Sequence, residues 1–138
     1  MTTDAPTWLP TDLISELDEK LGIRIVDWDP QRFVARMPVE GNRQPYGLLH
    51  GGATCSLVET VGSYAAALSA GPHAKVVGIE LNASYHRSAT SGEVTATCTP
   101  AGSDDDLPVR TFHIEVVDDE QRLTSTARLT CMVLSGRD

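Results

Sequence analysis

The chain has 138 residues and a formal net charge of -8, which is enough length for one domain with a core of its own. The negative net charge argues against nucleic acid or an anionic membrane surface as the main partner. No apolar run is long enough to span a bilayer. We therefore expect a single domain over residues 1–138, in which residues 1–10 form a loose N-terminal segment.

The first third of the chain predicts a short helix and two strands. Leucines spaced four apart indicate a helix over residues 13–21, which Thr11 or Asp12 would cap and Gly22 would end. Two strand patterns and a loop follow it: residues 23–27, residues 32–37 after a turn at Asp29-Pro30, and residues 39–47.

One long helix and four strands are predicted for the rest. The helix pattern begins directly after the loop and stops near Gly71-Pro72. Apolar and polar residues then alternate in four stretches: residues 75–85, 92–99, 109–117 and 123–134. In the first of these, Val77, Ile79 and Leu81 would share one face. A period of two over this much chain indicates antiparallel strands, so we predict an α+β domain in which a curved antiparallel sheet wraps one central helix.

The loop before the long helix has an unusual composition. It reads Gln44-Pro45-Tyr46-Gly47-Leu48-Leu49-His50-Gly51-Gly52 and runs straight into the helix. Two glycines at this point let another group approach the first helix N–H groups, which have no partner inside the helix and lie at the positive end of its dipole. Such a terminus can bind an anion or polarise a carbonyl oxygen.

The long helix has two different faces. One is an ordinary core face: Ala53, Leu57, Val61, Tyr64 and Leu68. The other carries small residues with a single carboxylate among them: Gly52, Cys55, Ser56, Glu59, Gly62, Ser63 and Ala66. A solvated face would carry several long charged side chains, so we expect this face to pack against a backbone, a partner helix or a ligand. Glu59 would be a partly buried acid, which makes it a candidate base or nucleophile, and Ser63 lies one turn away.

The cysteines indicate neither disulfides nor a metal site. Cys55, Cys98 and Cys131 are odd in number, widely spaced and form no CxxC pair. A reducing, cytoplasmic location fits this pattern and the absence of a signal-peptide pattern at the start. Cys55 could be considered as a nucleophile, but small cysteines usually just pack.

The loop-helix segment resembles the hotdog-fold thioesterases. The resemblance rests on Gln44, the His50-Gly51-Gly52 triplet six residues on, Glu59 and the hydroxyl of Ser63. It is similar to the branch that contains Arthrobacter-type 4-hydroxybenzoyl-CoA thioesterase, PaaI-like enzymes and menaquinone-pathway dihydroxynaphthoyl-CoA thioesterases. The predicted order of elements agrees over residues 13–134. Ser63 stands where some relatives have threonine, which keeps the hydroxyl.

The resemblance implies a role for each residue of the motif. Glu59 would be the nucleophile or general base, and the sequence does not choose between the two. The Gly51 N–H would polarise the thioester carbonyl, while Gln44 would assist at that carbonyl or at the thiolate. The remaining implied roles are these: His50 orients the thioester or shapes the site, Ser63 holds the hydrolytic water, and Tyr85-His86-Arg87-Ser88 bind the pantetheine and nucleotide of CoA.

Plainer readings stay open beside these roles. His50 could simply cap the helix, and Ser63 could only pack. Glu59 could be structural, and His86-Arg87 could be a solvated loop. Arg110 and Arg128 could be surface charges or reach a phosphate, while Asp104, Asp105 and Asp106 indicate a solvated turn.

Helix geometry then predicts a shared site. Gly51 and Glu59 are eight residues apart, or about 12 Å along a helix axis, so one thioester cannot touch both in one chain. If both act on the same carbonyl, Gln44, His50 and Gly51 come from one subunit, and Glu59 and Ser63 come from another. We expect at least a homodimer, and by resemblance a homotetramer built as a dimer of dimers.

The sequence therefore predicts a thioesterase that hydrolyses an aromatic or medium-sized acyl-CoA without a metal or cofactor. A hotdog hydratase or dehydratase and a non-catalytic acyl-CoA-binding module are the alternatives.

Overall fold

The computed structural model describes residues 4–9, 15–102 and 107–134. Two helices and six strands follow one another in the predicted order: α1 (Glu16–Leu21), β1 (Arg24–Asp29), β2 (Arg32–Pro38), α2 (Gly51–Ala70), β3 (Lys75–Tyr85), β4 (Glu93–Pro100), β5 (Val109–Val117) and β6 (Leu123–Leu134). The predicted α+β class is confirmed. The predicted single domain over residues 1–138 remains a prediction. Asp104, Asp105 and Asp106 and part of the predicted loose segment (residues 1–3 and 10) lie outside the described residues.

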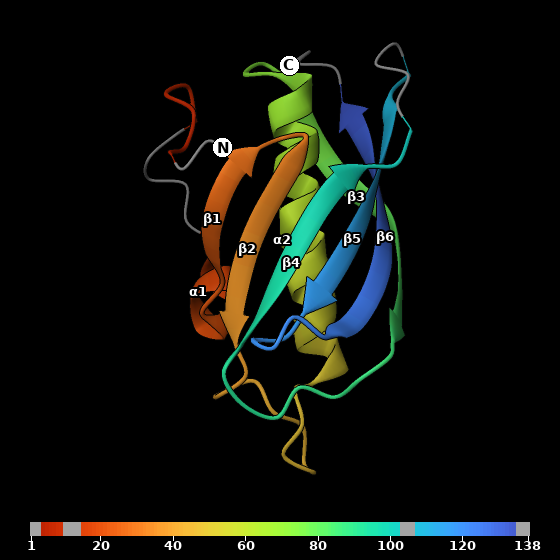
Figure 1. Ribbon diagram of the computed structural model, residues 1–138. Coiled ribbons are helices and arrows are strands. Elements are labelled where there is room, and N and C mark those ends of the chain that lie inside the picture. Colours follow the sequence, from red (N-terminus) through yellow and green to blue (C-terminus); the bar gives the residue numbers. More distant parts are fainter. Residues whose placement is uncertain (1–3, 10–14, 103–106, 135–138) are drawn as a thin grey trace.

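The sheet curves around α2, as Figure 1 shows. Its strand order is β1-β2-β4-β5-β6-β3, and neighbouring strands are antiparallel. The inward-facing residues of β4, β5 and residues 125–131 of β6 alternate as predicted, and Ala96, Ile114 and Leu129 are fully buried. At the start of β6 the prediction was wrong, because Leu123 is exposed and Thr124 is buried. Burial of one such aliphatic side chain as large as Leu or Ile stabilises the fold by about 1.5–3 kcal/mol. The core therefore lies between the concave side of the sheet and one side of α2.

The helix α1 begins later than predicted. Its N-cap is Ser15, whose hydroxyl accepts the N–H of Asp18 at 3.2 Å. The predicted caps Thr11 and Asp12 lie outside the described residues, and the helix boundary at residue 13 was wrong by three residues. Gly22 ends the helix as predicted, in a left-handed conformation with φ of 75°.

The prediction for β3 was wrong about which residues share a face. The pairing with β6 shifts between Gly78 and Glu80, so Ile79 is an inserted bulge residue. Because of the bulge, Leu81 faces the core while Val77 and Ile79 are 46% and 53% exposed. β3 is also an edge strand of the sheet, so these two apolar side chains lie at a free edge.

The two faces of α2 are also divided differently. Ala53, Leu57 and Val61 are buried as predicted, and Tyr64 and Leu68 pack against the core partly buried. Gly62 and Ala66 were assigned to the open face, but both are buried. A Cβ atom at Gly62 would lie 2.3 Å from Leu129 Cδ2, so the sheet approaches the helix too closely there for any side chain. The open face reduces to Gly52, Cys55, Ser56, Glu59 and Ser63.

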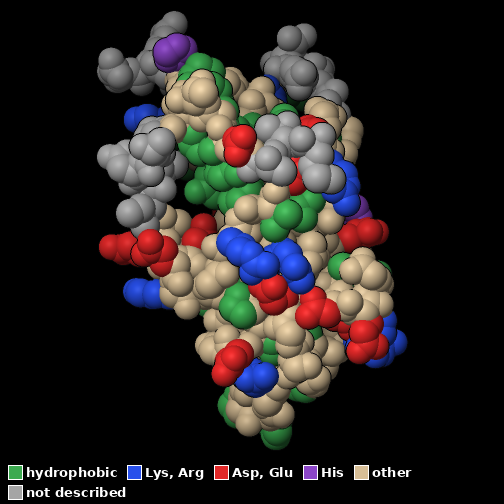
Figure 2. Space-filling model, turned by 60° about the vertical axis from the view of Figure 1, so that its left-hand side comes forward, with side chains coloured by type: hydrophobic (Ala, Val, Ile, Leu, Met, Phe, Trp, Pro, Cys, Tyr) green, Lys and Arg blue, Asp and Glu red, His purple; other side chains and the backbone are tan. Residues whose placement is uncertain are grey.

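The outer surface carries paired charges. Figure 2 shows acidic and basic side chains side by side on the face that the left-hand side of Figure 1 presents. Ion pairs join Arg24 to Glu93, and Arg36 to both Glu93 and Asp119. The three cysteines are free, with Cys98 and Cys131 buried. No helix in the described ranges is both long and apolar enough to cross a membrane.

Candidate active site

The loop before α2 is closed by the side chain of Gln44. Its Oε1 accepts the backbone N–H groups of Tyr46 and, at 3.3 Å, of Leu48. The Gln44 N–H donates to the Leu48 carbonyl at 2.7 Å, and a positive φ of 83° at Gly47 allows the chain to turn between them. With the oxygen engaged by the loop, the Nε2 amide is the group that Gln44 can offer to another molecule.

His50 caps α2. Its Nδ1 accepts the N–H of Gly52 at 2.7 Å, and its carbonyl accepts the N–H groups of Ala53 and Thr54. Nδ1 therefore carries no proton, and the neutral ring carries it on Nε2. Behind the cap, the buried Asn42 accepts the His50 N–H at 2.9 Å, and its side chain donates to the Leu21 and Pro38 carbonyls. The position of the cap is thus fixed to α1 and β2.

The N–H of Gly51 is the remaining amide of the first turn. The next three N–H groups are engaged by His50, whereas that of Gly51 makes no hydrogen bond within the described part of the chain. Both glycines are in close contact with neighbouring side chains: a Cβ atom would lie 2.9 Å from the Tyr85 hydroxyl oxygen at Gly51, and 2.9 Å from His50 Nδ1 at Gly52. A side chain at either position would therefore displace Tyr85 or the His50 cap.

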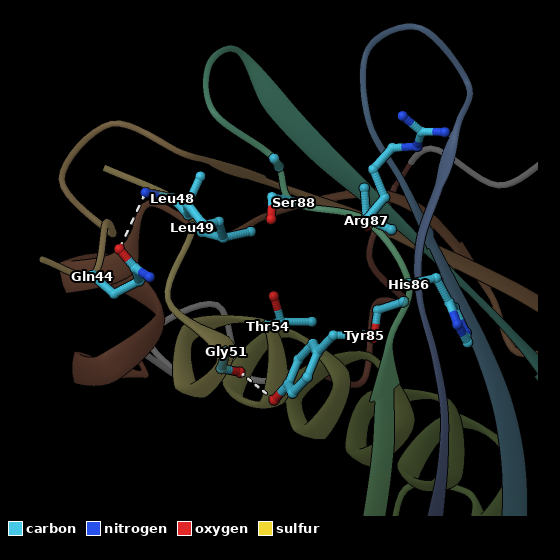
Figure 3. Close-up of a pocket in the computed structure, with 12 residues that line it drawn as sticks. Gln44, Leu48, Leu49, Gly51, Thr54, Tyr85, His86, Arg87 and Ser88 are labelled. Carbon is cyan, nitrogen blue, oxygen red and sulfur yellow. Dashed lines mark hydrogen bonds between the residues drawn. The ribbon is translucent and has the colours of Figure 1, made fainter. Parts of the chain in front are cut away.

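A cleft of about 500 Å³ opens at this helix end. Gln44, Gly51 and Thr54 line one side, and Tyr85, His86, Arg87 and Ser88 line the other. In Figure 3 the hydroxyls of Thr54 and Ser88 face each other across the cleft, while the His86 ring points away from it. The His86 Nε2 lies 2.8 Å from the Thr126 hydroxyl.

Tyr85 closes the cleft over the first turn of α2. Its hydroxyl donates to the Gly51 carbonyl at 2.9 Å (Figure 3). The same hydroxyl lies 3.2 Å from Cys55 Sγ. Because a phenol has one proton, Cys55 must be the donor in the second bond, which requires a protonated thiol. The bond with Cys55 and burial raise the pKa of Tyr85 to about 12. This arrangement disfavours the nucleophilic reading of Cys55.

Glu59 and Ser63 lie in a different place. Both line a second cavity, of about 330 Å³, between α1 and α2. The Glu59 carboxylate rests over Gly78, where a Cβ atom would lie 2.2 Å from Glu59 Oε1. Burial, followed by the charge of Glu59, raises the pKa of the Cys131 thiol to about 11, and the neighbouring Ser63 opposes this rise.

One chain therefore does not bring all the predicted residues together. Gln44, Gly51 and the segment Tyr85-His86-Arg87-Ser88 share the first cleft, and His50 caps the helix beside it. Glu59 and Ser63 are two and three turns further along α2, or about 12 Å for Gly51 to Glu59. Neither Arg110 nor Arg128 lines the cleft.

Several residues of the two cavities were not predicted. Thr54, Thr124 and Ser125 line the first, and Asp18, Thr60 and Tyr64 line the second. Thr54 and Thr60 follow the motif residues Gly51 and Glu59 on the same helix, so helix periodicity could have found them. Asp18 and Thr124 reach the cavities through tertiary packing, which leaves no local signal. Within the described ranges, no three His, Cys, Asp or Glu side chains gather to hold a metal ion.

Comparison with known proteins identifies the family. Residues 46–125 match the family model described as the thioesterase superfamily. The chain is 40% identical over 115 residues to the 1,4-dihydroxy-2-naphthoyl-CoA hydrolase of Escherichia coli (strain K12), covering 83% of each protein. It is 36% identical over 122 residues to the proofreading thioesterase EntH of Cronobacter turicensis, covering 88% of each.

Solved structures agree with this fold. The crystal structure of thioesterase HI1161 from Haemophilus influenzae superposes with a TM-score of 0.83 at 34% identity, covering 88% of this chain and 85% of that one. The PaaI protein of Escherichia coli superposes with a TM-score of 0.78 at 22% identity, which shows a common fold.

The chain therefore belongs to the thioesterase superfamily and has the hotdog fold. It is a thioester hydrolase, which confirms the resemblance drawn from the residues around Gly51 and Glu59.

Proposed function

We propose that this protein is an acyl-CoA thioesterase, which hydrolyses an aromatic or medium-sized acyl-CoA to the free acid and CoA. The observation that carries the proposal is the free Gly51 N–H at the wall of the 500 Å³ cleft, beside the fixed amide of Gln44. The CoA hydrolase named among the relatives supports the choice of thioester.

The helix terminus supplies the electrophilic half of the site. The thioester carbonyl oxygen accepts the Gly51 N–H, at the positive end of the 20-residue helix α2, and the Gln44 Nε2–H. As the carbonyl becomes tetrahedral, its oxygen becomes negative and these bonds strengthen. Loss of one such donor costs about 10²–10³-fold in kcat.

Glu59 supplies the other half, by one of two routes. As a general base it takes a proton from a water held by Ser63. The water oxygen bonds to the carbonyl carbon, and the carbonyl electron pair moves to oxygen. Collapse of this intermediate breaks the C–S bond and releases the CoA thiolate, which takes up a proton. As a nucleophile, Glu59 forms a mixed anhydride that water then hydrolyses.

We propose that the two halves come from different subunits. Gly51 and Glu59 lie too far apart on one rigid helix for a single carbonyl to meet both. The open edge of β3 supports a second copy, because the exposed Val77 and Ile79 flank Gly78, which touches Glu59. A homodimer is thus the smallest active unit, and a homotetramer stays a prediction.

We assign the CoA moiety to the wall formed by Tyr85-His86-Arg87-Ser88. Arg87 gives this wall a positive charge in a chain with a net charge of -8, and guanidinium groups bind phosphates well. The side chain of His86 is held by Thr126, so in this proposal it shapes the wall rather than binding phosphate.

Mixing two inactive variants tests the shared site. Glu59→Gln is expected to release no measurable CoA while it still binds an acyl-CoA analogue, and Gln44→Ala is expected to lose about 10²–10³-fold in kcat. After subunit exchange of an equal mixture, about one quarter of the sites combine a native Gln44 with a native Glu59 on another chain. Recovery to about one quarter of wild-type activity supports the proposal, whereas no recovery despite proven exchange refutes it. Two Glu59→Gln preparations mixed together serve as the control.

Substrate scope separates the alternative functions. A thioesterase releases CoA from at least one of benzoyl-, phenylacetyl-, naphthoyl- and aliphatic acyl-CoA. A hydratase consumes an enoyl-CoA without releasing thiol, and a binding module binds these ligands without turnover.

A further inference from the structure

Asn42 is a buried side chain at the base of the loop before α2, and it lines neither of the two cavities described above. Its side-chain amide has two N–H bonds and uses both of them. Nδ2 donates to the Leu21 carbonyl at 2.7 Å and to the Pro38 carbonyl at 2.8 Å. Leu21 ends α1 and Pro38 ends β2, so one amide joins these two elements at the point where the loop begins.

The backbone between Asn42 and His50 forms a closed loop. The His50 N–H donates to the Asn42 carbonyl at 2.9 Å, which ties the two ends together. Further out, the Gln44 N–H donates to the Leu48 carbonyl at 2.7 Å, and the Gln44 side chain accepts the Leu48 N–H in return (Figure 3). Gln44 therefore leaves the base of this loop, and Gly51 follows directly where the loop returns to it.

The remaining anchors of the loop reach a different part of the molecule. The Leu49 N–H donates to the Ala89 carbonyl at 2.9 Å, and Arg43 Nη2 donates to the Thr90 carbonyl at 3.1 Å. Both bonds lead to the segment between β3 and β4. Among the described residues, the Asn42 amide makes the side-chain hydrogen bond that ties this loop to α1.

We propose that Asn42 is a positioning residue for the thioester carbonyl. Its amide fixes the base of the loop, and the loop fixes the Gln44 Nε2 and the Gly51 N–H relative to each other. The substrate does not contact Asn42. The inference rests on the proposed function, in which these two donors bind the carbonyl oxygen.

The chemistry of the site requires an amide at this position. A carboxylate of the same shape carries no N–H when it is ionised, and it would place a negative charge beside two carbonyl oxygens. Without the amide, the Leu21 and Pro38 carbonyls lose their partner and the base of the loop shifts. A shift of about 1 Å in groups that act on the substrate can cost about 10²-fold in rate.

Two variants of Asn42 test the proposal by steady-state thiol release. Asn42→Asp keeps the shape and removes both N–H donors, whereas Asn42→Ser keeps one shorter donor. In fully folded enzyme, kcat should fall about 100-fold in Asn42→Asp and about 10-fold in Asn42→Ser. KM should stay within about 3-fold of wild type, because Asn42 does not line the CoA cleft.

Gly62→Ala is the control for lost stability, because it disturbs the core at Leu129 and should keep its kcat. If Asn42→Asp does not fold, Asn42→Ser decides the outcome alone. A fully folded Asn42→Ser whose kcat stays within about 3-fold of wild type would overturn the proposal.

Hydrogen exchange supplies a measurement that is independent of turnover. Without ligand, the His50 amide should exchange at least about 10-fold faster in Asn42→Ser than in Gly62→Ala, since the base of the loop opens more often. If no thioester is hydrolysed but exchange rises in this way, the proposed function fails and the role of Asn42 in holding the loop stands. If CoA is released and the His50 amide exchanges equally in both variants, Asn42 does not position the site.

Discussion

Substitution of Gly78 by alanine tests whether the position of the Glu59 carboxylate controls catalysis. The new Cβ atom would lie 2.2 Å from Glu59 Oε1, whereas an ordinary contact is about 3.4 Å, so the carboxylate must retreat by about 1.2 Å. A displacement of this size can cost about 10²-fold in rate. We therefore expect Gly78→Ala to lower kcat about 100-fold with little change in KM, because the CoA cleft lies elsewhere.

Gly62→Ala is the matched control. There the overlap is nearly the same, 2.3 Å, but the atom met is Leu129 Cδ2 in the core. This variant should lose about 1–3 kcal/mol in the free energy of unfolding through overpacking, while the folded fraction keeps its kcat. Thiol release by steady-state kinetics and urea unfolding measure the two effects separately. An unchanged kcat in Gly78→Ala would refute the reasoning that Glu59 must hold this position.

Substitutions at three positions address the start of α2 and the tyrosine that contacts it. His50→Ala should lower the free energy of unfolding by about 1 kcal/mol through loss of the cap, and His50→Asn should restore it, so equal urea midpoints would contradict the capping role. Cys55→Ala should keep at least about half of wild-type kcat, because a protonated thiol is not the nucleophile; full inactivation would restore that reading. Tyr85→Phe should remove a pH dependence of stability: the wild-type phenol, with a pKa of about 12 when folded and an ordinary value of about 10 when unfolded, contributes stability below about pH 10 that is lost as pH rises toward about 12. Urea unfolding near pH 9 and pH 11 measures this loss of stability. If Tyr85→Phe loses as much stability as the wild type between these two pH values, the loss belongs to other groups.

Much of the fold was predictable because its patterns are local. The strands β4 and β5 and the middle of β6 alternate, and the glycine-rich loop marks the start of α2 without ambiguity. The error in β3 arose at Ile79, since a bulge has no signature in an alternation of apolar residues and depends on pairing with β6. The burial of Gly62 was likewise invisible, because a small residue suits both a close helix-sheet contact and an open face.

The candidate site was predictable in its residue types but not in its surroundings. The spacing of Gly51 and Glu59 along a helix follows from helix geometry alone. The capping bond of His50 and the loop bonds of Gln44 join residues close in the sequence, so they lie within the motif itself. The contacts of Glu59 with Gly78 and of Asp18 with Thr60 join segments 19 and 42 residues apart, and only the folded chain reveals them.

The helix α2 also limits how this protein can vary. One inserted residue between Gly51 and Glu59 would turn every later side chain by about 100° about the helix axis and advance it by about 1.5 Å. Glu59 would then no longer lie over Gly78, and Val61 would rotate out of the core. Insertions and deletions are therefore tolerable in the surface turns but not within this stretch of the helix. Its length fixes the distance between Gly51 and Glu59.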